Sequence, residues 1–580
     1  MADALVEERQ ELMVPRNGSN PVYRKAHFLK PIISQHDLHL LQSPPPNSLF
    51  SSKPCFEKLG KYSLQSYKGL PSQKWKSWVQ SLKPRYQETW KKAGIYDAIL
   101  ASTYTVPKDK MLIFGLAEWW CADTNTFMFP WGEVTITLED VVYLGCFSVL
   151  GASYSTPLDH EFIDIFKSLK NDHKNVRLRH RGNVSASSWI EYFMCTGSSL
   201  EHEAFLALWL SRFVLVRPQN YIGIKDFHVA IHLSRGMRIA FAPVVLACIY
   251  RDMRLLKNSI VEFMKLESVA GLRFISCHFD LVQMWVWERF TELRPVPNDI
   301  GMGEPRSLRW NGVTNLKVDD ARLALGSAGL SFFWRPYVII LGNSVLSNLY
   351  KDDEQWVVVD SDEVESFARC LRAAQLVGLG YTEQYLPHRV AMQFGLDQDL
   401  PHIVRFSGSP ETAWSTYIRP VRGVKLYIPP RLFDSGFSSR YVAWYKTLVS
   451  KTKCPSEPVE SSVQNMSSSF KCKKSKSSTG KQSEAKEYAD VSRNSKLPNK
   501  LVKMSGHSMS SNKSKERKSS TEIQTELEQD AVVSPEENIV TVEDERYDDN
   551  AMELHHLGLD ARIWRLERIS DTIKAARFSG

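Results

Sequence analysis

The residues that could do chemistry are few, and none stands in a complete catalytic pattern. His228 and His232 are one helical turn apart, so a helix could present both imidazoles on one face. The metalloprotease pattern also needs a glutamate directly after the first histidine, and Val229 stands there. Gly301 and Gly303 lack the third glycine of a dinucleotide-binding loop. We therefore interpret the histidines as core or surface residues, and the sequence predicts neither a metal nor a cofactor.

Three aspartates give a second hypothesis. Asp140, Asp280 and Asp360 could supply the carboxylates with which a transposase or a ribonuclease H-like nuclease binds two metal ions. Such a site holds its carboxylates at strand ends, whereas the patterns around these three aspartates are helical. A chain of this length also offers many such triples. We therefore predict that the protein is not an enzyme, and we assign no catalytic residue.

A segment of alternating basic and aromatic residues, 74–92, is the candidate for nucleic-acid binding. Its cations could contact phosphates while its aromatic rings stack on bases. The plainer interpretation is an amphipathic helix with an aromatic core side and solvated lysines, and Pro84 should kink or split this helix. The candidate contacts are Lys74, Lys76, Lys83, Arg85, Lys91 and Lys92.

A second polar set lies within an apolar run. It comprises His388, Arg389, Gln393, Asp397 and Gln398. These side chains could contact a partner or a nucleic acid. We favour the alternative that they form a buried network that fixes the last helix against the rest of the domain.

Composition limits the class of protein. At 580 residues, 43% of them hydrophobic, the chain exceeds what one core usually serves, so two or more lobes with tails are expected. Nine cysteines without a CxxC pair favour free thiols in a reducing compartment. The longest apolar run, 239–250, is shorter than the roughly 20 residues of a membrane span, so it predicts a buried helix and no membrane contact.

The elements that must position these residues are mostly helical. Residues 126–136 alternate apolar and polar residues around a turn, which predicts a hairpin with Phe127 and Phe129 facing Val134 and Ile136. A helix follows, which Thr137 should cap while the Asp140 side chain returns to the cap's N–H. Further helices are predicted at 201–216, 226–234, 239–256, 279–293 and from 363 to near 378, with Gly236 in a left-handed conformation between the second and third.

The end of the chain has a different character. Residues 451–520 hold 16 Lys and Arg against 6 Asp and Glu, and residues 521–550 hold 11 acids and 1 base, so 451–550 is predicted to be disordered. Residues 559–573 have the spacing of a short helix seam, which predicts weak self-association or docking on the domain. Two basic clusters are candidate nuclear import signals: Lys471, Lys473, Lys474 and Lys476, and Lys513, Lys515, Arg517 and Lys518.

Several motifs resemble the plant mobile domain, a family found in plant transposable elements and in host genes derived from them. They are TNTFMFPWGEVTITLEDV from residue 124, GMRIAFAPVVLACIYRDM from 236, LVQMWVWERFTEL from 281 and YLPHRVAMQFGLDQDLP from 385. The resemblance covers roughly residues 55–450 and is of the longer, host-gene type. It implies a mainly α, multi-helix domain at 56–450 with a small β-hairpin, after an N-terminal arm at 1–55 that lies over the domain or stays mobile. A disordered tail at 451–550 and a terminal helix at 551–580 complete the expected order.

The same resemblance implies a function. We expect a non-catalytic nuclear protein, derived from transposable-element machinery, that acts through nuclear partners in transposon silencing, gene-expression control, genome maintenance or meristem development. Phosphatase-like proteins that share the domain are candidate partners. The alternatives are a nucleic-acid-binding protein of the same origin and a transposase-like or aminotransferase-like enzyme. The last would need a lysine bonded to pyridoxal phosphate on an alternating strand and helix scaffold, which the sequence does not predict.

Overall fold

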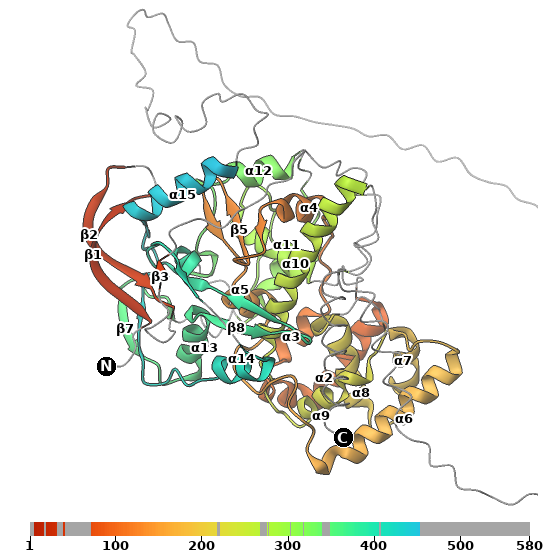
Figure 1. Ribbon diagram of the computed structural model, residues 1–580. Helices are drawn as coiled ribbons and strands as arrows, with labels where there is room; N and C mark the ends of the chain where they lie inside the picture. Colours follow the sequence, from red (N-terminus) through yellow and green to blue (C-terminus); the bar gives the residue numbers. More distant parts are fainter. Residues whose placement is uncertain are drawn as a thin grey trace, which may run out of the picture. The chain divides into compact units, whose positions relative to one another are not determined.

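The computed structural model describes residues 5–16, 19–31, 39–40, 71–216, 221–266, 275, 278–301, 303–316, 318, 320–338, 349–404 and 408–452. All of them belong to the first of the two units into which the chain divides, residues 1–470. Both basic clusters and the segment 559–573 lie outside the described residues, so what was predicted for them stays a prediction. Within the described residues, helices supply most of the regular structure and small sheets lie among them (Figure 1).

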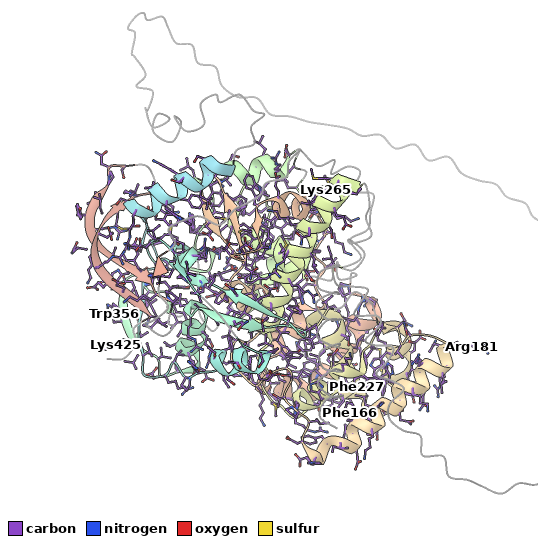
Figure 2. All side chains as sticks on the ribbon, in the orientation of Figure 1. Phe166, Arg181, Phe227, Lys265, Trp356 and Lys425 are labelled. Atoms are coloured by element: carbon purple, nitrogen blue, oxygen red, sulfur yellow. The ribbon has the colours of Figure 1, made fainter. Side chains whose placement is uncertain are left out.

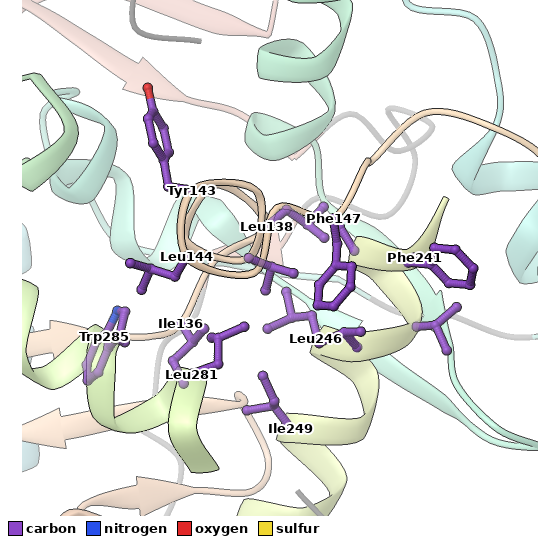
Figure 3. Close-up of a cluster of buried hydrophobic side chains, with 14 of the residues drawn as sticks. Ile136, Leu138, Tyr143, Leu144, Phe147, Phe241, Leu246, Ile249, Leu281 and Trp285 are labelled. Carbon is purple, nitrogen blue, oxygen red and sulfur yellow. The ribbon is translucent and has the colours of Figure 1, made fainter. Parts of the chain in front are cut away.

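Four largely buried helices pack against one another: α4 (Lys110–Glu118), α5 (Leu138–Gly145), α10 (Phe241–Leu266) and α11 (Phe279–Arg289). Figure 3 shows Leu138 and Leu144 of α5 directed toward α10 and α11, while Tyr143 points to the opposite side. Each leucine buried in this way stabilises the fold by about 1.5–3 kcal/mol relative to an exposed one. The predicted helices at 239–256 and 279–293 are confirmed as α10 and α11.

The predicted hairpin is confirmed. Strands β4 (Trp120–Cys121), β5 (Thr126–Phe129) and β6 (Gly132–Val134) form an antiparallel sheet. Phe127 lies opposite Val134 as expected, but Phe129 lies opposite Gly132 and not Ile136, because the turn takes only two residues. After β6 the chain enters α5 through the predicted capping box, in which Thr137 and Asp140 each bind the other's backbone N–H.

A second set of helices packs around α8, which is buried along its whole length from Glu201 to Trp209. The helix predicted at 201–216 is thus confirmed, with a π-helical turn in place of its last α-helical residues. Gly236 follows α9 with a φ of 80°, the predicted left-handed conformation. This set comprises α2 (Gln73–Lys92), α3 (Tyr96–Ala101), α6 (Ile163–His180), α7 (Ala186–Phe193), α8 (Glu201–Trp209), the π-helical turn η3 (Leu210–Val214) and α9 (Phe227–Ser234).

Helix α2 runs continuously through Pro84, so the predicted split is wrong. A proline removes one backbone hydrogen bond, and here both Pro84 and Gln80 one turn earlier are exposed, so water can satisfy the freed carbonyl. Trp78 and Leu82, which are fully buried, hold the helix against the core on its other side.

The remaining helices include one whose predicted end is wrong. Helix α13 ends at Leu371 and not near Gly378, because the Arg372 guanidinium turns away to donate to the carbonyls of Thr416 and Tyr417. Residues 374–377 form a strand instead. The remaining α-helices are α12 (Ala321–Ser327), α13 (Asp362–Leu371), α14 (Pro410–Tyr417) and α15 (Ser439–Thr452). The 3-10 helices are η2 (His160–Phe162), η4 (Ile224–Asp226), η6 (Arg306–Trp310), η7 (Pro336–Val338) and η9 (Pro387–Phe394).

Strands are more numerous than the single hairpin predicted, so the expected fold class is met only in part. In the part of the chain that the structure describes, they form five small sheets, ordered β12-β1-β2, β10-β3, β11-β7, β4-β5-β6 and β8-β9. The additional strands are β1 (Val6–Val14), β2 (Val22–Leu29), β3 (His39–Leu40), β7 (Gln355–Val358), β8 (Ala374–Val377), β9 (Thr382–Tyr385), β10 (His402–Ile403), β11 (Lys425–Ile428) and β12 (Phe437–Ser438).

Residues 5–16 and 19–31 take a defined place in the fold. Strands β1 and β2 pair with each other, and β1 also pairs with β12. The buried Asp397 carboxylate accepts hydrogen bonds from the Arg24 guanidinium and from the N–H groups of His27 and Gly436. The N-terminal arm was expected either to lie over the domain or to stay mobile, and these residues lie against the domain.

The sequence also predicted that the chain has no membrane span and that its cysteines are free thiols. No helix among the described residues has the length and apolar character needed to cross a bilayer. Five of the cysteines are described, and all of them are free thiols: Cys121, Cys146, Cys195, Cys248 and Cys370.

Candidate functional site

Three acidic side chains of the motifs, Asp140, Glu133 and Glu288, are buried and bound by arginines. Asp140 on α5 and Arg289 on α11 form an ion pair of 2.7 Å, and both side chains are fully buried. The Tyr337 hydroxyl donates to the same carboxylate oxygen at 2.7 Å, and the Thr137 N–H donates to the other at 2.7 Å. The carboxylate that caps α5 therefore also joins α11 and the segment around residue 337.

Two more carboxylates repeat this arrangement. Glu288 on α11 accepts hydrogen bonds from Arg306, Arg309 and the Trp310 indole, at distances between 2.7 and 3.1 Å. Glu133 on β6 receives both the Nε and Nη2 groups of Arg389, at 2.6 and 3.0 Å. Because guanidinium and indole groups occupy these oxygens, the carboxylates have little capacity left for a metal ion. In the described ranges, no three His, Cys, Asp or Glu side chains are grouped as metal ligands.

Glu139, next to Asp140, differs from the other motif carboxylates. Burial raises its pKa to about 7, although the Tyr350 hydroxyl donates to it and lowers the pKa in part. A carboxyl with a pKa near neutrality suits general acid or base catalysis only where a substrate can reach it. Glu139 is 1% exposed and Tyr350 is 5% exposed. The raised pKa of Glu139 is therefore that of a carboxyl group buried in the core.

The aspartate triple of the sequence analysis does not form a site. Asp140 lies in α5, Asp280 begins α11, and the exposed Asp360 precedes α13. The His228 and His232 rings each donate an Nε2–H to a backbone carbonyl, of Tyr154 and Pro157, at 3.0 Å. Both histidines thus hold one loop against α9, which supports the structural interpretation.

The polar set at 388–398 forms a buried network, the favoured alternative. The Gln393 side chain both donates to and accepts from the backbone of Thr135 at 2.8 Å, and Gln398 binds the backbone of His388 and Ala391. These bonds fix the 387–398 segment to the β5–β6 hairpin. The network was expected to fix the last helix, α15. That helix is held instead by its own Arg440, whose guanidinium binds Asp399.

A cavity of about 60 Å³ lies between α3, α5 and α11. It is lined by Tyr104, Lys108, Phe147 and Met284 among others. Sites for small molecules usually measure about 300–1,000 Å³, so this one has room for a few water molecules only.

The basic helix α2 presents a core side and a solvent side. The rings of Trp75, Trp78 and Trp90 are buried, and Trp75 stacks on Phe205 of α8 with ring centroids 4.8 Å apart. These rings therefore cannot stack on bases, which supports the amphipathic interpretation. The predicted contacts remain on the exposed or half-buried side: Lys74, Lys76, Lys83, Arg85, Lys91 and Lys92.

Three of the six α2 cations already have acidic partners. Lys74 pairs with Glu191 at 2.6 Å, Arg85 with Glu201 at 2.9 Å and Lys91 with Glu88 at 2.8 Å. The ammonium groups of Lys83 and Lys91 also lie over the ring of Tyr96, at 5.5 and 5.6 Å. Much of the charge that made this segment a candidate is thus neutralised within the domain.

Sequence reasoning missed a second basic surface, on the outer side of α6. We call Lys170, Lys174, Arg177 and Arg181 the α6 face; all four are exposed. The signal was present in the sequence, because these positions recur at intervals of four, three and four residues, which places them on one side of a helix. Figure 2 labels Arg181 at the outer end of this helix.

The comparisons with known proteins settle the family. A family model described as the plant mobile domain matches residues 94–446. The chain belongs to the plant mobile domain family. The matched span contains α6 and the pairs that Asp140, Glu133 and Glu288 form with arginines, whereas α2 precedes it. The resemblance found in the motifs is therefore confirmed.

Two plant relatives carry the same likeness. The chain is 36% identical over 342 residues to Protein MAIN-LIKE 2 of Arabidopsis thaliana, covering 55% of this chain and 46% of that protein. It is 23% identical over 399 residues to a serine/threonine-protein phosphatase 7 long form homolog of the same plant, covering 60% of this chain and 27% of that protein. The chain thus spans about half and about a quarter of these relatives' lengths. No solved structure matches it.

Breaking the buried pair between α5 and α11 should be far more costly than breaking an exposed one. Arg289→Met leaves the Asp140 carboxylate in the core without its cation, and we expect the free energy of unfolding to fall by about 3–5 kcal/mol. Lys167→Met, which breaks an exposed pair with Asp164, should cost much less. Urea unfolding followed by circular dichroism measures both, and equal losses would contradict the role given to Arg289.

Glu139→Gln should stabilise the protein above pH 7. The raised pKa means that the folded state favours the protonated carboxyl, so Glu139 lowers stability progressively as the pH rises from about 4.5 to about 7. A glutamine cannot ionise and still accepts from Tyr350, so the variant should gain on the order of 3 kcal/mol at pH 8 and little at pH 4. Urea unfolding across this range measures the difference. A stability gain that is the same at both pH values would rule out the buried, neutral carboxyl.

Proposed function

We propose that this protein is a non-catalytic nuclear protein, derived from transposable-element machinery, whose mobile domain acts through partners in transposon silencing, gene-expression control or genome maintenance. The observation that supports it best is the state of the motif carboxylates. Asp140, Glu133 and Glu288 are buried and bound by Arg289, Arg389 and the pair Arg306 and Arg309. Residues engaged in this way hold the domain together, which leaves its surface to act on other molecules.

The choice of partner rests on the relatives. One of them is named a protein phosphatase 7 long form homolog, and only about a quarter of its length is matched by this chain. Phosphatase-like proteins that carry the mobile domain are therefore proposed as partners. Affinity purification from plant nuclei, followed by mass spectrometry, tests this with the full chain and with a chain truncated after Ser450 and given an unrelated import signal. Both should recover the same nuclear proteins, because both keep the domain. Loss of all partners on truncation would place docking in the tail and contradict the proposal.

Nuclear import is proposed to depend on the two basic clusters of the tail. Changing all eight of their cations to glutamine should move a fluorescent fusion of the full chain out of the nucleus: Lys471, Lys473, Lys474, Lys476, Lys513, Lys515, Arg517 and Lys518. The segment 451–520 offers a matched control, because its other eight cations can be changed with the same loss of charge: Lys451, Lys453, Lys481, Lys486, Arg493, Lys496, Lys500 and Lys503. That control should stay nuclear. Equal mislocalisation of both variants would show that total charge matters and the clusters do not.

A further inference from the structure

The cations of the α6 face have no acidic partner within the part of the chain that the structure describes. Residues 163–181 contain six Lys and Arg against two Asp. Asp164 pairs with Lys167, and Asp172 accepts a hydrogen bond from the Tyr192 hydroxyl at 3.0 Å. Both acids of the helix are therefore engaged elsewhere, and the α6 face keeps its full positive charge. This contrasts with α2, where the domain's own carboxylates pair with three of the cations.

The helix that carries these cations is firmly held on its other side. Leu169 and Val176 are fully buried, and the His173 ring donates to the backbone carbonyl of Ile222 at 3.0 Å. Phe166 packs edge to face on Phe227 of α9, and Figure 2 labels these two residues close to one another. The backbone positions of the α6 face are therefore fixed in spacing before any ligand arrives.

Arg181 adds an independent observation. It follows the last turn of α6 with a φ of 49°, a left-handed conformation that glycine takes more readily than other residues. The next residue, Gly182, would suit that conformation without strain, yet the charged side chain occupies it. The chain thus keeps a cation at a position where the backbone favours glycine.

We propose that the α6 face binds the phosphate backbone of a nucleic-acid duplex without reading its sequence. From Lys170 to Arg181 the row extends about 16 Å along the helix, at a rise of about 1.5 Å per residue. A DNA duplex carries one negative charge per about 1.7 Å of its axis, so several phosphates lie within reach of each cation. The exposed Asn171 beside the row can donate to phosphate oxygens as well.

Two other polyanions fit the face less well. Binding in a membrane interface requires an amphipathic helix to insert its apolar side, and that side of α6 is packed against α7 and α9. Leu178, 65% exposed, is the large apolar side chain that remains outside on this helix. An acidic peptide would need carboxylates held in register with a straight row of cations, whereas a duplex presents its charges at regular spacing along a rigid rod. The α6 face is a different surface from the buried motifs, and its binding to a duplex does not depend on the proposed partners.

The test measures the affinity of the full chain for a 20-base-pair DNA duplex, and for an RNA duplex of the same length, between about 50 and 200 mM salt. The variant Lys170→Gln, Lys174→Gln, Arg177→Gln, Arg181→Gly removes the α6 face. Each lost phosphate contact should flatten the dependence of log affinity on log salt by about 0.9, so the slope should fall by about 3–4. The tail is the same in all chains, so the change in slope reports the α6 face alone.

A matched control removes the same charge from paired cations, in the variant Lys74→Gln, Arg85→Gln, Lys91→Gln, Lys167→Gln. Its slope should stay within about one of the wild type. Arg181→Gly alone separates binding from folding, because it should raise the melting temperature while it lowers the slope by about one. An unchanged slope in the α6 variant with intact circular dichroism would overturn the proposal, as would equal effects of the two fourfold variants. Equally tight, equally salt-dependent binding of polyglutamate would assign the face to acidic peptides instead.

Discussion

The ion pair between Asp140 and Arg289 is the contact on which the rest of the described fold depends. Both side chains are fully buried, and they come from positions 149 residues apart. Asp140 also caps its own helix and accepts the Tyr337 hydroxyl, 197 residues further along the chain. A buried carboxylate without these donors would cost several kcal/mol, so α5, α11 and the segment around Tyr337 must meet in one arrangement. Glu288 and Glu133 impose the same condition on η6 and η9.

This constraint explains why charged residues of the most recognisable motifs are buried. The acidic and basic residues that stand out in the sequence face one another in the interior, where guanidinium and hydroxyl donors bind the carboxylates. The cavity between α3, α5 and α11 measures about 60 Å³, and Glu139, the carboxyl with a pKa near 7, is buried with Tyr350. In this chain, the α6 face is the basic surface that the interior leaves unneutralised.

The sequence predicted best what depends on near neighbours. The β5–β6 hairpin, the capping box of Thr137 and Asp140, and the left-handed Gly236 are all local, and each was predicted from residues within a few positions. What depends on distant residues was missed. Helix α13 ends before Arg372, whose guanidinium binds carbonyls more than forty residues further along the chain. Strand β2, which pairs with β1, is likewise held by hydrogen bonds to Asp397, which is distant in the sequence. For the same reason the sequence could not show that Lys74 and Arg85 of the candidate nucleic-acid segment have acidic partners, whereas the cations of the α6 face have none among the described residues.

Buried carboxylate and arginine pairs should make the motif-bearing helices the most stable part of the domain. Hydrogen exchange of the full chain, resolved by peptide over a series of urea concentrations below the unfolding transition, measures this stability. We expect the amides of β5, β6, α5 and α11 to form the slowest class and to exchange only when the whole domain unfolds. Exchange of α5 and α11 through a lower-energy opening, while α2 and α8 stay protected, would contradict it.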